Sequence, residues 1–172
     1  GSAIETVECW ELVLENKTGP SLLALSRQNL NEFRQSLDLE SKYNPCKNGA
    51  YCVASNSKKP EFSIFASGSE VNIAIEAYQE LSRLNREVSV YSVPCLDYFN
   101  SQDKDFRESI ICNATCNVVV EAGVSQGWDK ILRDNGIFIG MSTFGASGPY
   151  KDLYKNFNIT KERIIDVILN SK

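Results

Sequence analysis

An arginine stands at the end of an apolar run, in the stretch Ser26-Arg27-Gln28. The five residues from Ser21 to Leu25 are small or apolar, which is typical of a strand buried on both faces. Folds built from parallel strands and helices place ligand sites at the carboxyl ends of their strands. A planar guanidinium can donate two parallel hydrogen bonds to a phosphate, so Arg27 is a candidate phosphate-binding residue. A surface ion pair is the alternative role.

A second candidate site is the turn Ser67-Gly68-Ser69, which lies between an expected strand and an expected helix. Free backbone N–H groups at the start of a helix can bind an anion. The full glycine-rich phosphate-binding pattern is absent, however, which favours a capped helix start without a ligand. Ser67 and Glu70 have the spacing of a capping box, in which the two residues satisfy each other's backbone N–H groups.

Groups for proton transfer are scarce in this sequence. The chain has no histidine, which excludes Ser-His-Asp and Cys-His catalysis and the most common metal ligand. Glu121 could serve as an acid or base at the end of a strand, but no second carboxylate lies near it in the sequence, so a structural role is favoured. We expect no catalytic residue, no cofactor-binding residue and no metal ligand in this chain.

Composition narrows the possible partners. The net charge is −4 and the basic residues are scattered singly, so nucleic acid is not an expected partner. No apolar run approaches the ~18 residues of a membrane span, so a membrane is not expected either. The six cysteines form no Cys-x-x-Cys pair, which favours reduced thiols and a cytoplasmic location. The opening Gly1-Ser2 resembles the remnant of a cleaved tag, as in a piece of a longer protein.

The elements that must position these groups alternate between strands and helices. A helix is expected at 3–16 and a strand at 21–26, followed by a polar linker at 31–45. Five further strands are expected at 50–54, 62–66, 88–93, 116–122 and 136–141, with helices after 67, at 105–111 and after Thr160. This order predicts a three-layer α/β/α sandwich around a five-stranded, mostly parallel sheet with one antiparallel edge strand.

Four spaced motifs connect these elements to a known family. They are Ser-Arg-Gln at 26–28, Gly-Ser-Glu at 68–70, Glu-Ala-Gly-x-x-x-Gly-Trp at 121–128 and Phe-Gly-x-Ser-x-Pro at 144–149. In combination they resemble the C-terminal part of transketolases, nearly end to end. Residues 1–30 resemble the end of the pyrimidine-binding domain of that family, 31–45 a linker, and 46–172 the C-terminal domain. Deoxyxylulose phosphate synthase and the β chain of 2-oxoacid dehydrogenases share this architecture without this motif set, and they are the second choice.

The resemblance implies a role for Arg27 and a place for the missing chemistry. The buried strand expected at 21–26 needs neighbours, and only eighteen residues precede Gly19, so those neighbours would lie upstream. In the family the arginine of the Ser-Arg-Gln segment lies in the substrate channel and binds the sugar phosphate. The thiamine diphosphate, the divalent metal, the activating glutamate and the channel histidines lie upstream. Gly148 and Asp129 are small departures from the family pattern.

The implied parent enzyme is a homodimeric transferase of the pentose phosphate pathway, which moves a two-carbon ketol unit between sugar phosphates. We expect this chain alone to bind no cofactor and to be inactive, and to support the structure and the dimer of the whole enzyme. An alternative from a different class is an independent α/β binding module that uses the turn at 67–70 for a small anionic ligand.

Overall fold

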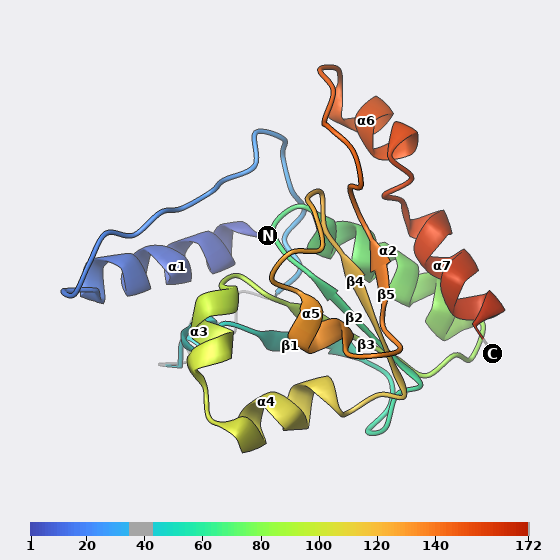
Figure 1. Cartoon of the computed structure of the whole chain (residues 1–172), viewed down its shortest axis with the longest axis horizontal. Helices are drawn as coiled ribbons and strands as arrows, with labels where there is room; N and C mark the ends of the chain where they lie inside the picture. Colours follow the sequence, from blue (N-terminus) through green and yellow to red (C-terminus); the bar gives the residue numbers. More distant parts are fainter. Residues whose placement is uncertain (35–42, 172) are drawn as a thin grey trace.

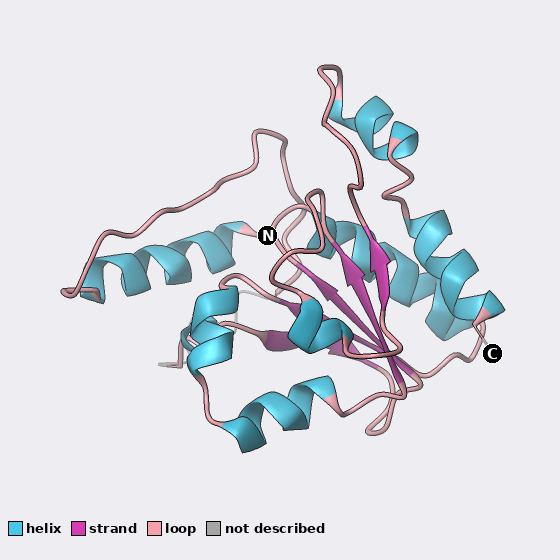
Figure 2. Ribbon diagram, viewed as in Figure 1, coloured by secondary structure: helices cyan, strands magenta, loops and turns pink. Residues whose placement is uncertain are grey.

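The described residues of the computed structural model, 1–34 and 43–171, form an α/β fold around one five-stranded sheet (Figures 1 and 2). The strand order is β1-β3-β2-β4-β5, and the strands are β1 (Tyr51–Ser55), β2 (Phe62–Ala66), β3 (Val88–Ser92), β4 (Cys116–Val120) and β5 (Ile137–Ile139). β1 pairs with β3 in the antiparallel direction, and all other pairs are parallel. The predicted mostly parallel sheet with one antiparallel edge strand is confirmed.

Helices cover both faces of the sheet. They are α1 (Ala3–Glu15), the short 3-10 helix η2 (Pro45–Asn48), α2 (Glu70–Arg83), α3 (Leu96–Ser101), α4 (Lys104–Ile111), α5 (Asp129–Leu132), α6 (Tyr150–Asn156) and α7 (Lys161–Asn170). α2 and α7 cover one face, whereas α3, α4 and α5 lie on the other (Figures 1 and 2). The predicted three-layer arrangement is therefore confirmed.

The alternation of side chains along β2 shows why two cores form. Ile64 packs with the apolar side chains of α2 and α7, whereas its neighbour Phe65 packs on the opposite face with Phe99 of α3. Successive side chains of a strand point to opposite faces, so a central strand covered on both faces is buried throughout and mostly apolar. All five residues of β2 are buried, and Phe65 also stacks on Tyr91 at 4.9 Å between ring centroids. The five predicted strands lie within two residues of their observed ends.

The strand predicted at 21–26 was wrong. These residues are described, and they form neither a strand nor a helix. Two of their leucines are exposed, Leu22 at 90% and Leu25 at 59%. A strand exists through hydrogen bonds to a neighbouring strand, and no described strand of this chain lies beside this segment. The apolar composition predicted burial, but within the described residues no surface covers Leu22 or Leu25.

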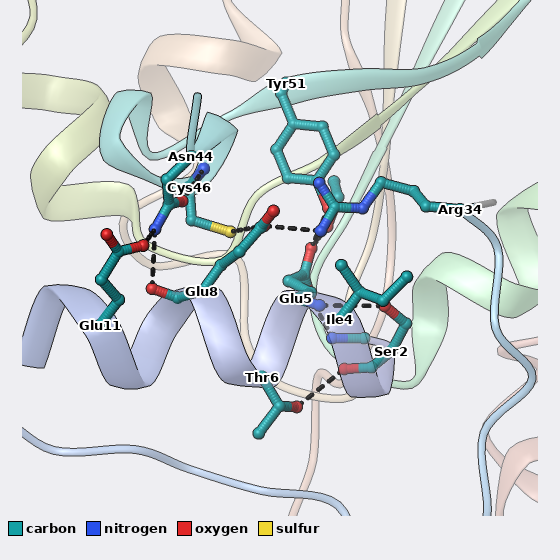
Figure 3. Close-up of polar contacts among 12 residues, drawn as sticks. Ser2, Ile4, Glu5, Thr6, Glu8, Glu11, Arg34, Asn44, Cys46 and Tyr51 are labelled. Carbon is teal, nitrogen blue, oxygen red and sulfur yellow. Dashed lines mark hydrogen bonds and ion pairs between the residues drawn. The ribbon is translucent and has the colours of Figure 1, made fainter. Parts of the chain in front are cut away.

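Helix α1 packs on this chain through its polar side (Figure 3). The carboxylate of Glu5 is 2% exposed and accepts hydrogen bonds from the hydroxyls of Tyr51, at 2.7 Å, and Ser92. Glu8 accepts from Arg34 at 2.6 Å and from the thiol of Cys46 at 3.2 Å. The opposite, apolar side of the helix is open to solvent, as shown by exposed fractions of 65%, 48% and 67% for Val7, Trp10 and Leu14.

The boundaries of the predicted linker cannot be followed along its whole length, because residues 35–42 of the range 31–45 lie outside the described residues. In the described part of the chain, none of the helices has the length and apolar character needed to cross a lipid bilayer.

Candidate ligand site at the carboxyl edge of the sheet

The segment containing Arg27 lies against a distant part of the chain. The side-chain amide of Gln28 donates a hydrogen bond to the hydroxyl of Tyr154 on α6, at 3.4 Å, across 126 positions of sequence. Ser26 and Gln28 line a cavity of about 350 Å³ together with Ala122, after β4, and Tyr154. The cavity therefore forms where the Ser-Arg-Gln segment, the end of β4 and α6 meet, at the edge where parallel strands place their ligand sites.

Arg27 itself is exposed in an open groove of about 680 Å³. Gln28, Asn29, Gly148 and Tyr150 line the groove with it, so the structure brings the Ser-Arg-Gln segment next to the Phe-Gly-x-Ser-x-Pro segment. Within the described residues, Arg27 makes no ion pair. The alternative of a surface ion pair thus finds no partner in this part of the chain, and the guanidinium is open to a ligand.

The turn Ser67-Gly68-Ser69 does lie between a strand and a helix, but its hydroxyl groups are already engaged. Ser67 donates to Oε2 of Glu121 at 2.7 Å, and Ser69 donates to Oε1 of Glu70 at 2.8 Å. Two carboxylates beside the turn repel a negatively charged ligand. The anion-binding interpretation of this turn therefore has no electrostatic support from its surroundings.

The predicted capping box at Ser67 and Glu70 was wrong. α2 begins at Glu70 with Ser69 at the N-cap, and no side chain caps the helix. The hydroxyl of Ser67 bonds Glu121, and the carboxylate of Glu70 accepts the hydroxyl of Tyr154. The spacing of Ser67 and Glu70 fits a capping box. In the folded chain, however, the two side chains bind Glu121, after β4, and Tyr154, on α6, instead.

Tyr154 connects three segments through one hydroxyl group. It donates to the carboxylate of Glu70, which is 3% exposed, and it lies 2.9 Å from the hydroxyl of Ser69. Burial raises the pKa of Tyr154 well above its ordinary value, and the charge of Glu70 raises it further. The tyrosine is therefore a protonated donor that fixes α6 and, through Gln28, the segment that carries Arg27.

Glu121 has an unusual environment at the end of β4. Burial raises the pKa of its carboxyl group above the ordinary value, the hydrogen bond from Ser67 opposes this rise, and the charge of Glu70 adds to it. No second carboxylate lies close to Glu121 in the sequence, but the fold brings Glu70 near it. A carboxyl group with a raised pKa keeps its proton to a higher pH than an ordinary glutamate, and protonation of Glu121 would reduce its repulsion with Glu70.

The described residues do not fit a metal ion, because their Cys, Asp and Glu side chains form no group of three or more that could hold one. All six cysteines are free thiols.

Arg27, the turn at 67–69, Glu70 and Glu121 were all singled out from the sequence, although Glu70 was assigned to a helix cap. Tyr154 carried no recognisable signal, because α6 has seven residues and none of its side chains is buried. A short helix with such a surface lacks the apolar periodicity by which a helix is predicted.

Comparisons with known proteins agree with this geometry. Residues 49–160 match the family model described as the transketolase-like TK C-terminal domain. Transketolase 2 of Aliivibrio fischeri is 38% identical over 164 residues, which are 95% of this chain and 24% of that protein. This chain thus spans about a quarter of the length of the curated relatives that it matches.

Two solved structures show the same similarity. A transketolase from Leishmania mexicana has a TM-score of 0.84 and 36% identity, over 97% of this chain and 23% of that chain. A transketolase from Pichia stipitis in complex with sedoheptulose 7-phosphate has a TM-score of 0.79 and 28% identity, over 94% of this chain and 23% of that chain.

Proposed function

The chain belongs to the transketolase family, and on that premise we propose that it forms the C-terminal region of an enzyme that transfers a two-carbon ketol unit from a ketose phosphate to an aldose phosphate. The observation that carries the proposal is the position of Arg27. This arginine is exposed in a groove that the Ser-Arg-Gln segment shares with Gly148 and Tyr150, and it makes no ion pair within the described residues.

In this proposal Arg27 binds the phosphate group of the sugar. Its guanidinium can present two parallel N–H groups to two phosphate oxygens, which gives both attraction and orientation. The Pichia stipitis transketolase holds sedoheptulose 7-phosphate, a ligand of the chemical class that this arginine would recognise. The groove beside Arg27 leaves room for such a group.

The neighbouring residues of this chain position the arginine. Tyr154 holds Gln28 through its hydroxyl, and it is itself anchored on the buried carboxylate of Glu70. Because Gln28 follows Arg27 directly, this chain of hydrogen bonds limits where the guanidinium can reach. Glu70 and Tyr154 are thus positioning residues for substrate binding.

The chemistry of bond cleavage lies outside this chain in our proposal. Thiamine diphosphate, held with a divalent metal, supplies a stabilised carbanion when bound. The described residues offer no group of three side chains that could hold the metal. The rest of the enzyme would hold both groups, the isolated chain would be inactive, and the working enzyme would be a cytoplasmic homodimer. Titration of the isolated chain with thiamine diphosphate and Mg²⁺ in a calorimeter should give no saturable heat.

A chimera tests the proposed function. Residues 1–172 replace the matching C-terminal region of Aliivibrio fischeri transketolase 2, and the purified protein is assayed for ketol transfer between sugar phosphates. We expect a folded, cofactor-binding enzyme with measurable transketolase activity. A chimera that folds and binds thiamine diphosphate but transfers no ketol unit would overturn the proposal.

A further inference from the structure

A basic pocket lies between α4 and α5, on the sheet face opposite α2 and α7. It has a volume of about 300 Å³. Charged side chains and one thiol dominate its lining, which includes Lys104, Arg107, Glu108, Cys112, Lys130 and Arg133. Four cations and one carboxylate leave an excess of positive charge in a chain whose net charge is −4.

The cations of this pocket are poorly neutralised. Lys104 pairs with Glu108 at 3.7 Å, but both side chains are more than half exposed, so the pair is weak. Within the described ranges 1–34 and 43–171, the other three cations make no ion pair.

One donor of the pocket also lacks an acceptor. The Nε atom of Arg107 is buried and has no hydrogen-bond partner among the described residues. A buried donor without an acceptor is costly, so an anion that reached this atom would be favoured as well by the unpaired cations beside it.

A thiol completes the pocket. Cys112 is exposed, and its sulfur accepts a hydrogen bond from Nη1 of Arg133 at 2.9 Å. This contact holds the sulfur beside the cations, within reach of a bound anion. A nucleophilic atom and an anion-binding surface therefore share one cavity.

We propose that this pocket is a modification site at which Cys112 undergoes thiol–disulfide exchange with anionic disulfides of the glutathione type. The carboxylates of such a disulfide match the cations of the pocket. Cys112 gives up its proton to solvent, and its sulfur attacks one sulfur of the disulfide. A new S–S bond forms to Cys112, the original S–S bond breaks, and the released glutathione thiolate takes up a proton. The cysteine sulfur is oxidised while the released thiol is reduced, so no other oxidant is needed.

The chain contains an internal control in Cys52 on strand β1. This thiol is also exposed, but it does not line the basic pocket. Although the residue is exposed, partial desolvation by its surroundings raises the pKa of Cys52, which opposes formation of its thiolate. Any difference in charge preference between the two cysteines therefore reports on the pocket.

The test uses the full chain with its thiols reduced. It is treated with oxidised glutathione, with neutral hydroxyethyl disulfide and with cationic cystamine, and the modification rate at each cysteine is followed by peptide mass spectrometry. At Cys112 we expect the anionic disulfide to react about tenfold or more faster than the cationic one, because cations raise the local concentration of an anion. High salt should remove most of this preference. Cys52 should show no such preference.

Two double variants test whether the preference of Cys112 for an anionic disulfide comes from the pocket. Arg107→Gln combined with Lys130→Gln should bring the anionic and cationic rates at Cys112 close together, whereas Lys58→Gln combined with Lys59→Gln should leave the preference intact. The proposal is overturned if Cys112 shows no anionic preference, reacts no faster than Cys52 with oxidised glutathione, or keeps its preference in the pocket variant. Should that variant fail to fold, the salt series and the disulfide series on the unaltered chain decide.

Discussion

The hydroxyl of Tyr154 is the most constrained group at the carboxyl edge of the sheet. Replacing Tyr154 by Phe keeps the ring but leaves the buried carboxylate of Glu70 without this donor. Losing a hydrogen bond to a buried charged group should lower the free energy of unfolding by about 1–3 kcal/mol. Urea unfolding at neutral pH measures the change. Tyr150→Phe is the control, because that side chain is 43% exposed, and an equal loss in both variants would contradict this role for Tyr154.

Glu121 should make stability depend on pH. Because its pKa in the folded protein is raised, mainly by burial, the unfolded chain loses this proton first and stability falls as the pH rises through these values. Glu121→Gln removes the ionisation and keeps an oxygen for Ser67. The variant should be more stable than the unaltered chain at pH 7, with the difference vanishing toward roughly pH 4, the ordinary range of a glutamate. Denaturant titrations across this range measure it, and a variant that is less stable at pH 7 would contradict the prediction.

Single residues differed in how far the sequence could predict them. Arg27 follows an apolar run in a recognisable motif, so the sequence alone made it a candidate. Glu70 and Glu121 are 51 positions apart, and only the parallel pairing of β2 with β4 brings their surroundings together. Contacts of this kind depend on the order of strands in the sheet, which no local pattern contains.

At the scale of elements, the helices and strands that are most buried within this chain were the easiest to predict from the sequence. β2 and β3 are buried along their whole length, and their mostly apolar sequences predicted them directly. α3 and α6 have only six and seven residues, too few for a clear apolar period, and neither was predicted. The apolar face of α1 predicted the helix, but that face is exposed, since none of the residues that the structure describes covers it.

The cap of the last helix can be tested directly. The hydroxyl of Thr160 accepts a hydrogen bond from the backbone N–H of Arg163 at 3.3 Å and so caps α7. Thr160→Ala should lower the free energy of unfolding by about 0.5–2 kcal/mol, because a backbone donor loses its partner. Thr143→Ala, at an exposed position outside any helix, serves as the control in the same thermal or urea unfolding. A loss no larger than that of the control would show that the cap contributes nothing.

At the scale of the whole molecule, we expect the N-terminal segment at residues 3–30 to cause self-association. Val7, Trp10, Leu14, Leu22 and Leu25 are all exposed, and each large apolar side chain left in water forgoes about 1.5–3 kcal/mol of burial. We expect light scattering to show association of the full chain. A truncation to residues 44–172 should fold, because it keeps the whole sheet, and should remain monomeric.

Two results would contradict this view of the molecule. A monomeric full chain would show that the exposed side chains do not drive association. A truncation that lacks cooperative unfolding would show that α1 is needed for the sheet, for example through the contacts of Glu5 with Tyr51 and Ser92.

The central claim is that this chain contributes a phosphate-binding arginine to the substrate channel of a transketolase, and Arg27→Ala in the active chimera tests it most directly. The measured quantity is kcat/KM for a phosphorylated ketose donor and for an unphosphorylated one, with the exposed Arg83→Ala as the matched control. A hydrogen bond to a charged group contributes about 1.5–3 kcal/mol, so the phosphorylated donor should lose roughly tenfold to a hundredfold. The unphosphorylated donor and the control should change much less. Equal losses for both donors, or no loss for either, would contradict the account.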